Sequence, residues 1–406
     1  MTAKGRIAIA GSVAQKAHNA GHTWQFLQYL LGFERLGYEV LLLDSLEHAD
    51  PADAAGERER VAYVHDVMRR HGLAHAWTIA LPGGRHAGLP RAQALRFVRD
   101  ADLLLNVMGF CADEELLGAA RRRVFLDTDP GFAQMWHALG LADVFDGHDA
   151  HVTIGERIGM DDCEIPTCGI DWVTTPQPVV LDAWPQASDP PRRPFTSVAS
   201  WRGAYGPVEY AGKKYGLRVH EFRRFVRLPA LTGRAFELAL AIHVAETPDL
   251  ALLRDTGWSL VDPADVATTP AAYRAFIAES TAELMIAKGM YVEARSGWFS
   301  ERSICYLASG RPVVAQDTGL RDLYPLGAGL LAFDTLDEAA ACVESIAIGY
   351  RRQADAARAL AEAHFDSDRV LGRLLEALGA VRRSMPRRAA GPRATTVPRP
   401  AAGAAA

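Results

Sequence analysis

The sequence contains no apolar run long enough to cross a membrane. A transmembrane helix needs about 20 consecutive apolar residues, and no stretch of this chain approaches that length. The opening residues, MTAKGRIAIAGS, lead directly into a strand pattern and do not resemble a signal peptide. We therefore expect a cytoplasmic protein without a transmembrane segment.

Cysteine is rare, and positive charge is not in excess. The 5 cysteines among 406 residues are odd in number and scattered, which favours reduced thiols over a disulfide framework. Cys163 and Cys168 are close in sequence, but no second pair or histidine cluster completes a metal site. The formal net charge is −5, whereas nucleic-acid binding usually needs a basic face. We expect neither a metal nor a nucleic-acid partner.

The glycine fingerprint of dinucleotide-binding folds is also missing. Arg6–Ala10 has the pattern of a buried strand, an amphipathic helix begins near Trp24, and Val40–Asp44 has the pattern of a second buried strand. This βαβ unit predicts a parallel sheet. The turn after the first strand reads GSVAQK, without G-x-G-x-x-G, so we expect no nicotinamide or flavin cofactor, although Asp44 closes the second strand.

Alternating strand and helix patterns run through both halves of the chain, separated by a proline-rich stretch at 168–194. This predicts an α/β protein of two Rossmann-like domains with parallel sheets, 1–187 and 188–384. In one segment, 235–243, periodicity does not distinguish a strand from a buried helix. Residues 385–406 are mostly Ala, Pro and Arg with little apolar surface to bury, which predicts a disordered tail.

The most informative stretch is 294–317, ARSGWFSERSICYLASGRPVVAQD. Ser300 is the expected N-cap of a helix, Gly310 the residue after its end, and 312–315 a buried parallel strand. The first turn of such a helix presents unpaired N–H groups and the positive end of the helix dipole, which bind anions such as phosphate.

The pattern S-x-R-x-x-x-x-L-A-S-G-x-P-V-V in this stretch resembles the donor-binding helix of GT-B glycosyltransferases. The resemblance implies two Rossmann-like domains facing across a deep cleft, with a nucleotide-diphosphate sugar held at the helix start. In that family a glutamate of this helix binds the ribose, but the matching residue here is Cys305. Glu301 lies one turn earlier, nearer the expected phosphates than the ribose.

The resemblance implies a cationic clamp for the leaving diphosphate, without a metal or other cofactor. Ser296, Gly297 and Ser300 would supply hydrogen-bond donors, and Arg302, Arg295 and Lys288 would supply positive charge. The alternative for Arg302 is a solvated helix surface. Further candidates are Arg202, in the loop after the second domain's first strand, and Trp298, which would stack on a base or sugar unless it covers the core.

His22 is the candidate general base. The segment AGHTWQFLQYLLGFERLGYEV resembles the Gly-His segment of inverting GT-B enzymes, in which the histidine takes the acceptor's proton. An imidazole with a pKa near ~6.5 suits that chemistry at neutral pH. The alternatives are a helix-capping or substrate-binding histidine, with His18 as a rival in the same loop.

Asp127 and Asp129 follow a buried strand, where α/β sheets place ligands. Either carboxylate would orient His22. The Asp-x-Asp spacing also resembles the metal-binding motif of the other glycosyltransferase fold, an interpretation that the GT-B resemblance disfavours. A structural role, accepting backbone N–H groups before Pro130, is the alternative.

Together these features predict a metal-independent glycosyltransferase of hexosyltransferase type that moves a sugar from a nucleotide-diphosphate sugar to a small acceptor or glycan. Gly21-His22 and the missing ribose glutamate favour an inverting reaction over a retaining one. Two alternatives stay open: a sugar-nucleotide 2-epimerase of the same fold, and a non-catalytic sugar-nucleotide-binding protein, which the change to Cys305 suggests.

Overall fold

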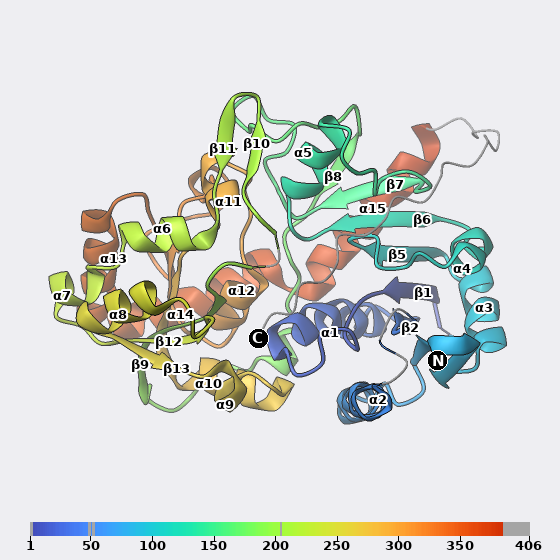
Figure 1. The fold of residues 1–406 in the computed structure, drawn as a ribbon, viewed down its shortest axis with the longest axis horizontal. Coiled ribbons are helices and arrows are strands. Elements are labelled where there is room, and N and C mark those ends of the chain that lie inside the picture. Colours follow the sequence, from blue (N-terminus) through green and yellow to red (C-terminus); the bar gives the residue numbers. More distant parts are fainter. Residues whose placement is uncertain (1–2, 48–49, 51–52, 204, 385–406) are drawn as a thin grey trace.

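The computed structural model describes residues 3–47, 50, 53–203 and 205–384. It contains two sheets, one mostly and one wholly parallel, each flanked by helices and lying side by side along the long axis of the molecule (Figure 1). This α/β arrangement confirms the predicted fold class. The predicted disordered tail, 385–406, lies outside the described residues. Among the described residues, no helix is both long and apolar enough to span a bilayer.

The first sheet has the strand order β4-β3-β2-β1-β5-β6-β7-β8, and β4 alone among its strands is antiparallel to its neighbour. Its strands are β1 (Gly5–Ala10), β2 (Tyr38–Ser45), β3 (Trp77–Leu81), β4 (Arg85–Gly88), β5 (Leu103–Val107), β6 (Arg123–Asp127), β7 (Ala150–Thr153) and β8 (Trp172–Thr174). The accompanying helices are α1 (Ala20–Arg35), α2 (Ala54–Arg70), α3 (Arg91–Asp100), α4 (Glu114–Ala119) and α5 (Phe132–Ala138).

The second sheet has the order β13-β12-β9-β14-β15-β16, and its strand pairs are all parallel. Its strands are β9 (Arg193–Ser200), β12 (Phe236–Ala241), β13 (Trp258–Val261), β14 (Ser280–Met285), β15 (Val313–Gln316) and β16 (Leu330–Phe333). The segment that periodicity left open is therefore strand β12. A separate antiparallel hairpin joins β10 (Val208–Tyr210) to β11 (Lys213–Tyr215).

Helices α6 to α14 accompany the strands of the second sheet. The last helix, α15, packs on the first half. These helices are α6 (Arg218–Arg224), α7 (Leu228–Thr232), α8 (Thr247–Asp255), α9 (Pro263–Val266), α10 (Pro270–Glu279), α11 (Gly289–Glu293), α12 (Glu301–Ala308), α13 (Leu336–Ile348), α14 (Tyr350–Leu360) and α15 (Ser367–Ser384).

Helix α15 packs against α1 and β8 of the first half, although the predicted second domain extended to residue 384. The Arg35 guanidinium of α1 lies 3.1 Å from the Asp368 carboxylate, and Leu371 packs against Gly32. Just before α15, the chain pairs with the segment that leads out of the first half: the Val179 N–H donates to the Phe365 carbonyl at 2.8 Å. The apolar face of α15 covers α1, a long-range contact that sequence periodicity cannot assign. The boundary at residue 188 stays a prediction.

Candidate functional site

An ion pair between Asp129 and Lys288 joins the two halves of the molecule. Asp129 lies two residues beyond β6, and Lys288 comes directly before α11, beyond the end of β14. The Lys288 ammonium nitrogen lies 2.9 and 2.7 Å from the two Asp129 carboxylate oxygens. The Tyr291 hydroxyl donates a further hydrogen bond to the same carboxylate. The carboxyl ends of β6 and β14 therefore meet here, in the position where parallel α/β sheets bind ligands.

Lys16 brings a second ammonium group toward this ion pair. It lies in the loop between β1 and α1, and its side chain makes no hydrogen bond or ion pair with any described residue. Burial by the surrounding protein and the Lys288 ammonium lower the pKa of Lys16, and the Asp129 carboxylate opposes them. Asp44 shapes this loop, because its carboxylate accepts the N–H groups of Ala14 at 2.6 Å and of Ser45 at 2.7 Å.

Arg218, the first residue of α6, adds a guanidinium from the second half. Its Nε donates to the Ile286 carbonyl and its Nη1 to the Ser200 carbonyl, each at 3.1 Å. Burial and the neighbouring Arg302 lower its pKa to about 10, while Tyr291 acts in the opposite direction. Arg218 is not among the site residues predicted from the sequence; its position at the first turn of a helix after a strand-end loop was the available signal.

The start of α12 presents one carboxyl group to the same region. The Ser300 hydroxyl caps the helix by accepting the Arg302 N–H at 3.2 Å, as predicted. Glu301 is half-buried, and its nearest hydrogen-bond partner is the Ser300 hydroxyl at 3.4 Å. Burial raises the pKa of Glu301, while Arg302 and Arg218 act against that shift. No described cation forms an ion pair with it, so the carboxylate retains free acceptor capacity.

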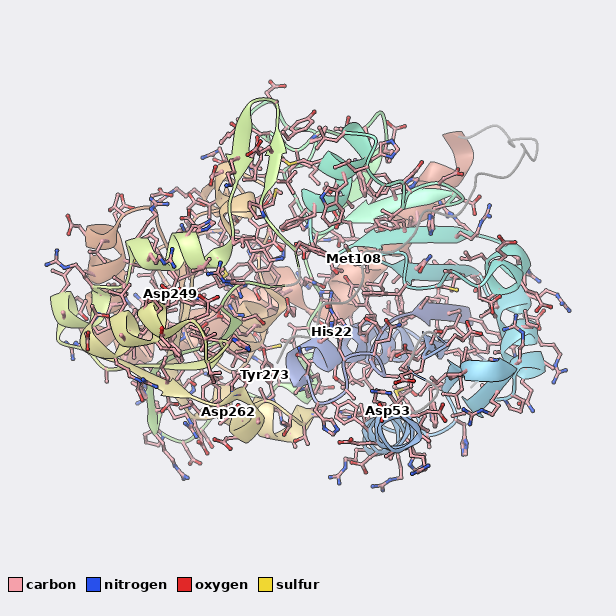
Figure 2. The ribbon with its side chains drawn as sticks, viewed as in Figure 1. His22, Asp53, Met108, Asp249, Asp262 and Tyr273 are labelled. Atoms are coloured by element: carbon pink, nitrogen blue, oxygen red, sulfur yellow. The ribbon has the colours of Figure 1, made fainter. Side chains whose placement is uncertain are left out.

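His22 lies in the first turn of α1, near the centre of the molecule (Figure 2). Its Nε2 lies 2.9 Å from the Ser12 hydroxyl, and the Asn19 side chain caps the helix by accepting the His22 N–H. Burial and the Lys16 ammonium lower the pKa of His22 to about 3. No described carboxylate is hydrogen-bonded to the imidazole. It is therefore neutral at physiological pH and a weak proton acceptor.

Comparison with solved structures identifies the arrangement of the two halves. AviGT4, a glycosyltransferase involved in avilamycin A biosynthesis, is similar over 94% of this chain and 99% of its own, with 14% identity and a TM-score of 0.53. An α-glucosyltransferase in complex with UDP matches over 93% and 100%, with 11% identity and a TM-score of 0.56. Anabaena Alr3699/HepE, in complex with UDP and glucose, matches over 93% and 100%, with 13% identity and a TM-score of 0.52. The chain has the GT-B fold. No protein-family model and no curated protein sequence matches it.

Within this GT-B fold, Arg302 supports the second sheet and lies next to Arg218, one member of the cation cluster formed by Lys16, Lys288 and Arg218. It is 6% exposed, its Nε donates to the fully buried Glu283 of β14, and its Nη1 donates to the Val198 carbonyl at 2.7 Å. The phosphate contact of Arg302 stays a prediction, and the alternative of a solvated surface does not describe this buried side chain. The sequence pattern placed the residue on the right helix, but the buried partner on β14 decides where its side chain points.

The loop before α12 supports Tyr291. Ser296 is fully buried, and its hydroxyl accepts the Trp298 N–H at 3.1 Å and donates to the Tyr291 carbonyl. The Trp298 ring stacks on Tyr291 with a centroid distance of 4.3 Å. Gly297 donates its N–H to the Thr318 carbonyl at 2.7 Å. The donor contacts of Ser296 and Gly297 stay predictions; the hydrogen bonds and stacking in the structure hold the loop that precedes the helix. Trp298, which is 6% exposed, has the core-covering position given as its alternative.

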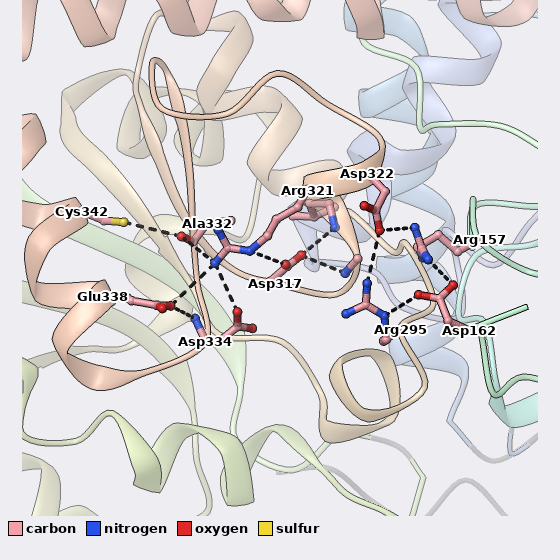
Figure 3. Close-up of polar contacts among 12 residues, drawn as sticks. Arg157, Asp162, Arg295, Asp317, Arg321, Asp322, Ala332, Asp334, Glu338 and Cys342 are labelled. Atoms are coloured by element: carbon pink, nitrogen blue, oxygen red, sulfur yellow. Dashed lines mark hydrogen bonds and ion pairs between the residues drawn. The ribbon is translucent and has the colours of Figure 1, made fainter. Parts of the chain in front are cut away.

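Arg295 and Arg202 form ion pairs away from Lys288. Arg295 lies 2.9 Å from Asp162 and 3.2 Å from Asp322, in a network that also contains the buried Arg157 (Figure 3). Arg202 pairs with Glu246 at 2.9 Å and is about half exposed. The structure therefore does not bring either arginine to the cluster, and of the predicted clamp cations only Lys288 is there.

Asp127 has the structural role that the sequence analysis gave as its alternative. It is fully buried and accepts hydrogen bonds from the side chains of Gln134 at 2.6 Å and Thr153 at 2.8 Å, and from the Asp129 N–H. Burial raises its pKa to about 6, against the effect of these donors. Neither Asp127 nor Asp129 orients His22. Across the described residues, no group of three or more His, Cys, Asp or Glu side chains is placed to hold a metal ion.

Proposed function

We propose that this protein is a glycosyltransferase, of hexosyltransferase type, that takes its sugar from a nucleotide-diphosphate sugar. The observation that carries the proposal is the set of cations from both halves, Lys16, Lys288 and Arg218, gathered where the strand ends of a GT-B fold meet. Breaking the bond between the sugar and the diphosphate places negative charge on the leaving group. Preorganised ammonium and guanidinium groups stabilise that charge, so the proposed reaction needs no metal.

Glu301 is the carboxylate that we assign to the donor. The position matching the ribose glutamate, Cys305, is 2% exposed and receives a hydrogen bond from Gln28 Nε2 at 3.6 Å. The Cys305 side chain therefore packs inside the protein and is not available to bind the ribose. Glu301 is half-buried, lies at the start of the same helix and has no cation partner among the described residues. Its free oxygens are suited to accept hydrogen bonds from sugar or ribose hydroxyl groups.

The low pKa of His22 changes the proposed mechanism. An inverting reaction would need an enzyme base, and the expected base has a pKa of about 3 without a carboxylate partner. We propose that the neutral His22 instead binds a substrate hydroxyl. A retaining reaction then fits better, because the leaving phosphate oxygen can itself accept the acceptor's proton. The acceptor stays in the predicted class of small molecules and glycans.

The test is calorimetry with UDP, GDP and dTDP, followed by the matching nucleotide sugars. Lys288→Ala should weaken binding of the preferred diphosphate by about 1.5–3 kcal/mol, the range for hydrogen bonds to charged groups. Lys213→Ala is the matched control, because Lys213 also joins the halves, through Glu164 at 2.6 Å, but is not part of the cation cluster. Absence of binding of all three diphosphates to the parent protein would contradict the proposal.

Product analysis separates the alternatives. A glycosyltransferase transfers the sugar or slowly hydrolyses the donor, and a 2-epimerase releases an epimerised sugar. If the protein binds the nucleotide sugar but forms no product with any acceptor tested, it is the non-catalytic sugar-nucleotide-binding protein.

A further inference from the structure

The anion position of the proposed donor site already holds a carboxylate of the protein. Both Asp129 oxygens contact the Lys288 ammonium at 2.9 and 2.7 Å, and the Tyr291 hydroxyl completes the contact. The Asp129 charge also acts on Lys16 and Arg218, where it opposes the lowering of their pKa values. Asp129 of the first half thus contacts one cation of the second half, Lys288, and acts electrostatically on Lys16 and Arg218.

A phosphate group that binds Lys288 meets Asp129 at the same ammonium. The Lys288 side chain is 15% exposed, and its ammonium is enclosed by the Asp129 carboxylate and by the rings of Phe132 at 4.8 Å and Tyr291 at 5.2 Å. A phosphate that approaches this ammonium therefore competes with Asp129 for the same N–H donors. The cleft expected between the two halves is therefore bridged at the point where the diphosphate should bind.

We propose that Asp129 is an internal competitor for the donor diphosphate, which holds Lys288 in the empty protein and is displaced when the donor binds. The inference rests on the proposed function, since it concerns the same site. A diphosphate carries more negative charge than one carboxylate and offers more acceptor oxygens to the Lys288 ammonium, so the exchange favours the donor. A neutral sugar cannot displace Asp129, and the site opens only for the anionic ligand.

A second contact of the same composition provides the comparison. Glu164 of the first half accepts hydrogen bonds from Lys213 at 2.6 Å and from the Tyr215 hydroxyl at 2.8 Å, both on the β10–β11 hairpin. This carboxylate–lysine–tyrosine contact also joins the halves, but Lys213 and Glu164 are 40% and 45% exposed. Removing it loosens the same two halves without freeing a cation of the proposed donor site.

The experiment compares Asp129→Asn and Glu164→Gln by calorimetry with UDP, GDP and dTDP. Internal competition predicts that Asp129→Asn tightens binding of the preferred diphosphate by about 3- to 10-fold, where tenfold corresponds to about 1.4 kcal/mol. Glu164→Gln should leave the affinity unchanged. Tyr291→Phe removes one hydrogen bond to Asp129 and should tighten binding by a smaller factor, and it provides the same test if Asp129→Asn fails to fold.

Three outcomes overturn the inference. Affinity that is unchanged or weaker in Asp129→Asn, with the parent protein still binding the diphosphate, makes Asp129 a structural or ligand-assisting residue and leaves the proposed function intact. Equal gains in diphosphate affinity in Asp129→Asn and Glu164→Gln would show that the gain comes from loosening the contact between the halves and not from removing a competitor. Failure of the parent and of every variant to bind any of the diphosphates removes the proposed function and the inference together.

Discussion

Arg302 and Lys288 are both cations at element ends of the second half, yet their surroundings give them different roles. Arg302 faces the fully buried Glu283 on β14, whereas Lys288 faces across to the first half. A buried carboxylate binds the nearest guanidinium strongly because neither charge is solvated. We therefore expect Arg302, which carries the sequence resemblance, to be mainly structural, and Lys288, at the strand end, to bind the ligand after Asp129 is displaced.

Arg302→Met should destabilise the protein strongly and leave diphosphate affinity nearly unchanged in the folded fraction. Removing one partner of a buried ion pair leaves an uncompensated charge and costs about 3–5 kcal/mol. Urea unfolding measures the loss. The double variant Arg302→Met with Glu283→Gln should be more stable than the single variant, because no charge then stays buried. Full stability of Arg302→Met with lost diphosphate binding would return Arg302 to the ligand site.

His22 should make the protein less stable in acid. Its pKa is lowered from 6.5 to about 3 in the folded state, so between these values the unfolded chain binds more protons than the folded protein. The free energy of unfolding contributed by His22 therefore falls as the pH drops from 6.5 toward 3. The His22→Gln variant should lose this part of the acid slope in urea titrations. Asp44 and Glu156, with pKa values raised by burial to about 7, contribute the opposite slope in both proteins and cancel in the comparison. Identical slopes in parent and variant would contradict the low pKa.

At the scale of elements, the local pattern predicted the α12 unit well and its contacts poorly. Ser300 is the N-cap, Gly310 follows the helix with a φ of +68°, and Val313–Gln316 is a parallel strand, as expected. Helix caps, helix-ending glycines and buried strands are set by neighbouring residues, so the sequence of the segment alone predicts them. The direction of each side chain depends on residues far away, such as Glu283 for Arg302 and Asp162 for Arg295. For the same reason, the sequence identified Lys288 and Asp129 separately but not their pairing.

Gly297→Ala should cost more stability than a glycine replacement in an open turn. Gly297 has a φ of +72°, and an added Cβ would lie 2.8 Å from Arg157 Cγ and 2.9 Å from the Arg157 backbone nitrogen. We expect about 1 kcal/mol of backbone strain plus about 1–3 kcal/mol of overpacking. Gly212, with a φ of +77° and nothing within 4 Å, is the control that retains only the strain. Thermal melting of the two variants measures the difference, and equal losses would show that Arg157 yields without cost.

At the scale of the whole molecule, the two halves share one interior, and the chain returns to the first half at α15. A single buried cluster includes Ile7 and Trp24 of the first half and Tyr273 and Tyr291 of the second. Figure 1 shows α15, from the end of the described chain, lying with the strands and helices of the first half. A single division of the sequence at the proline-rich stretch assigns α15 to the second domain, although this helix packs against α1 and β8 of the first half.

The last prediction follows from that return: the halves should unfold together, and a cavity under α15 should lower one common transition. Leu371 is fully buried against α1, so Leu371→Ala should cost about 2–5 kcal/mol. Leu231→Ala, at a position that is 51% exposed, should cost little. Differential scanning calorimetry should show one transition in both variants, displaced downward only for Leu371→Ala. α15 joins the second sheet's helices to α1 through Arg35–Asp368 and the Val179 backbone pairing, so loosening it destabilises both halves at once. If Leu371→Ala instead splits the transition in two, with the second half melting at its parental temperature, the halves are independent domains and α15 is only a peripheral contact.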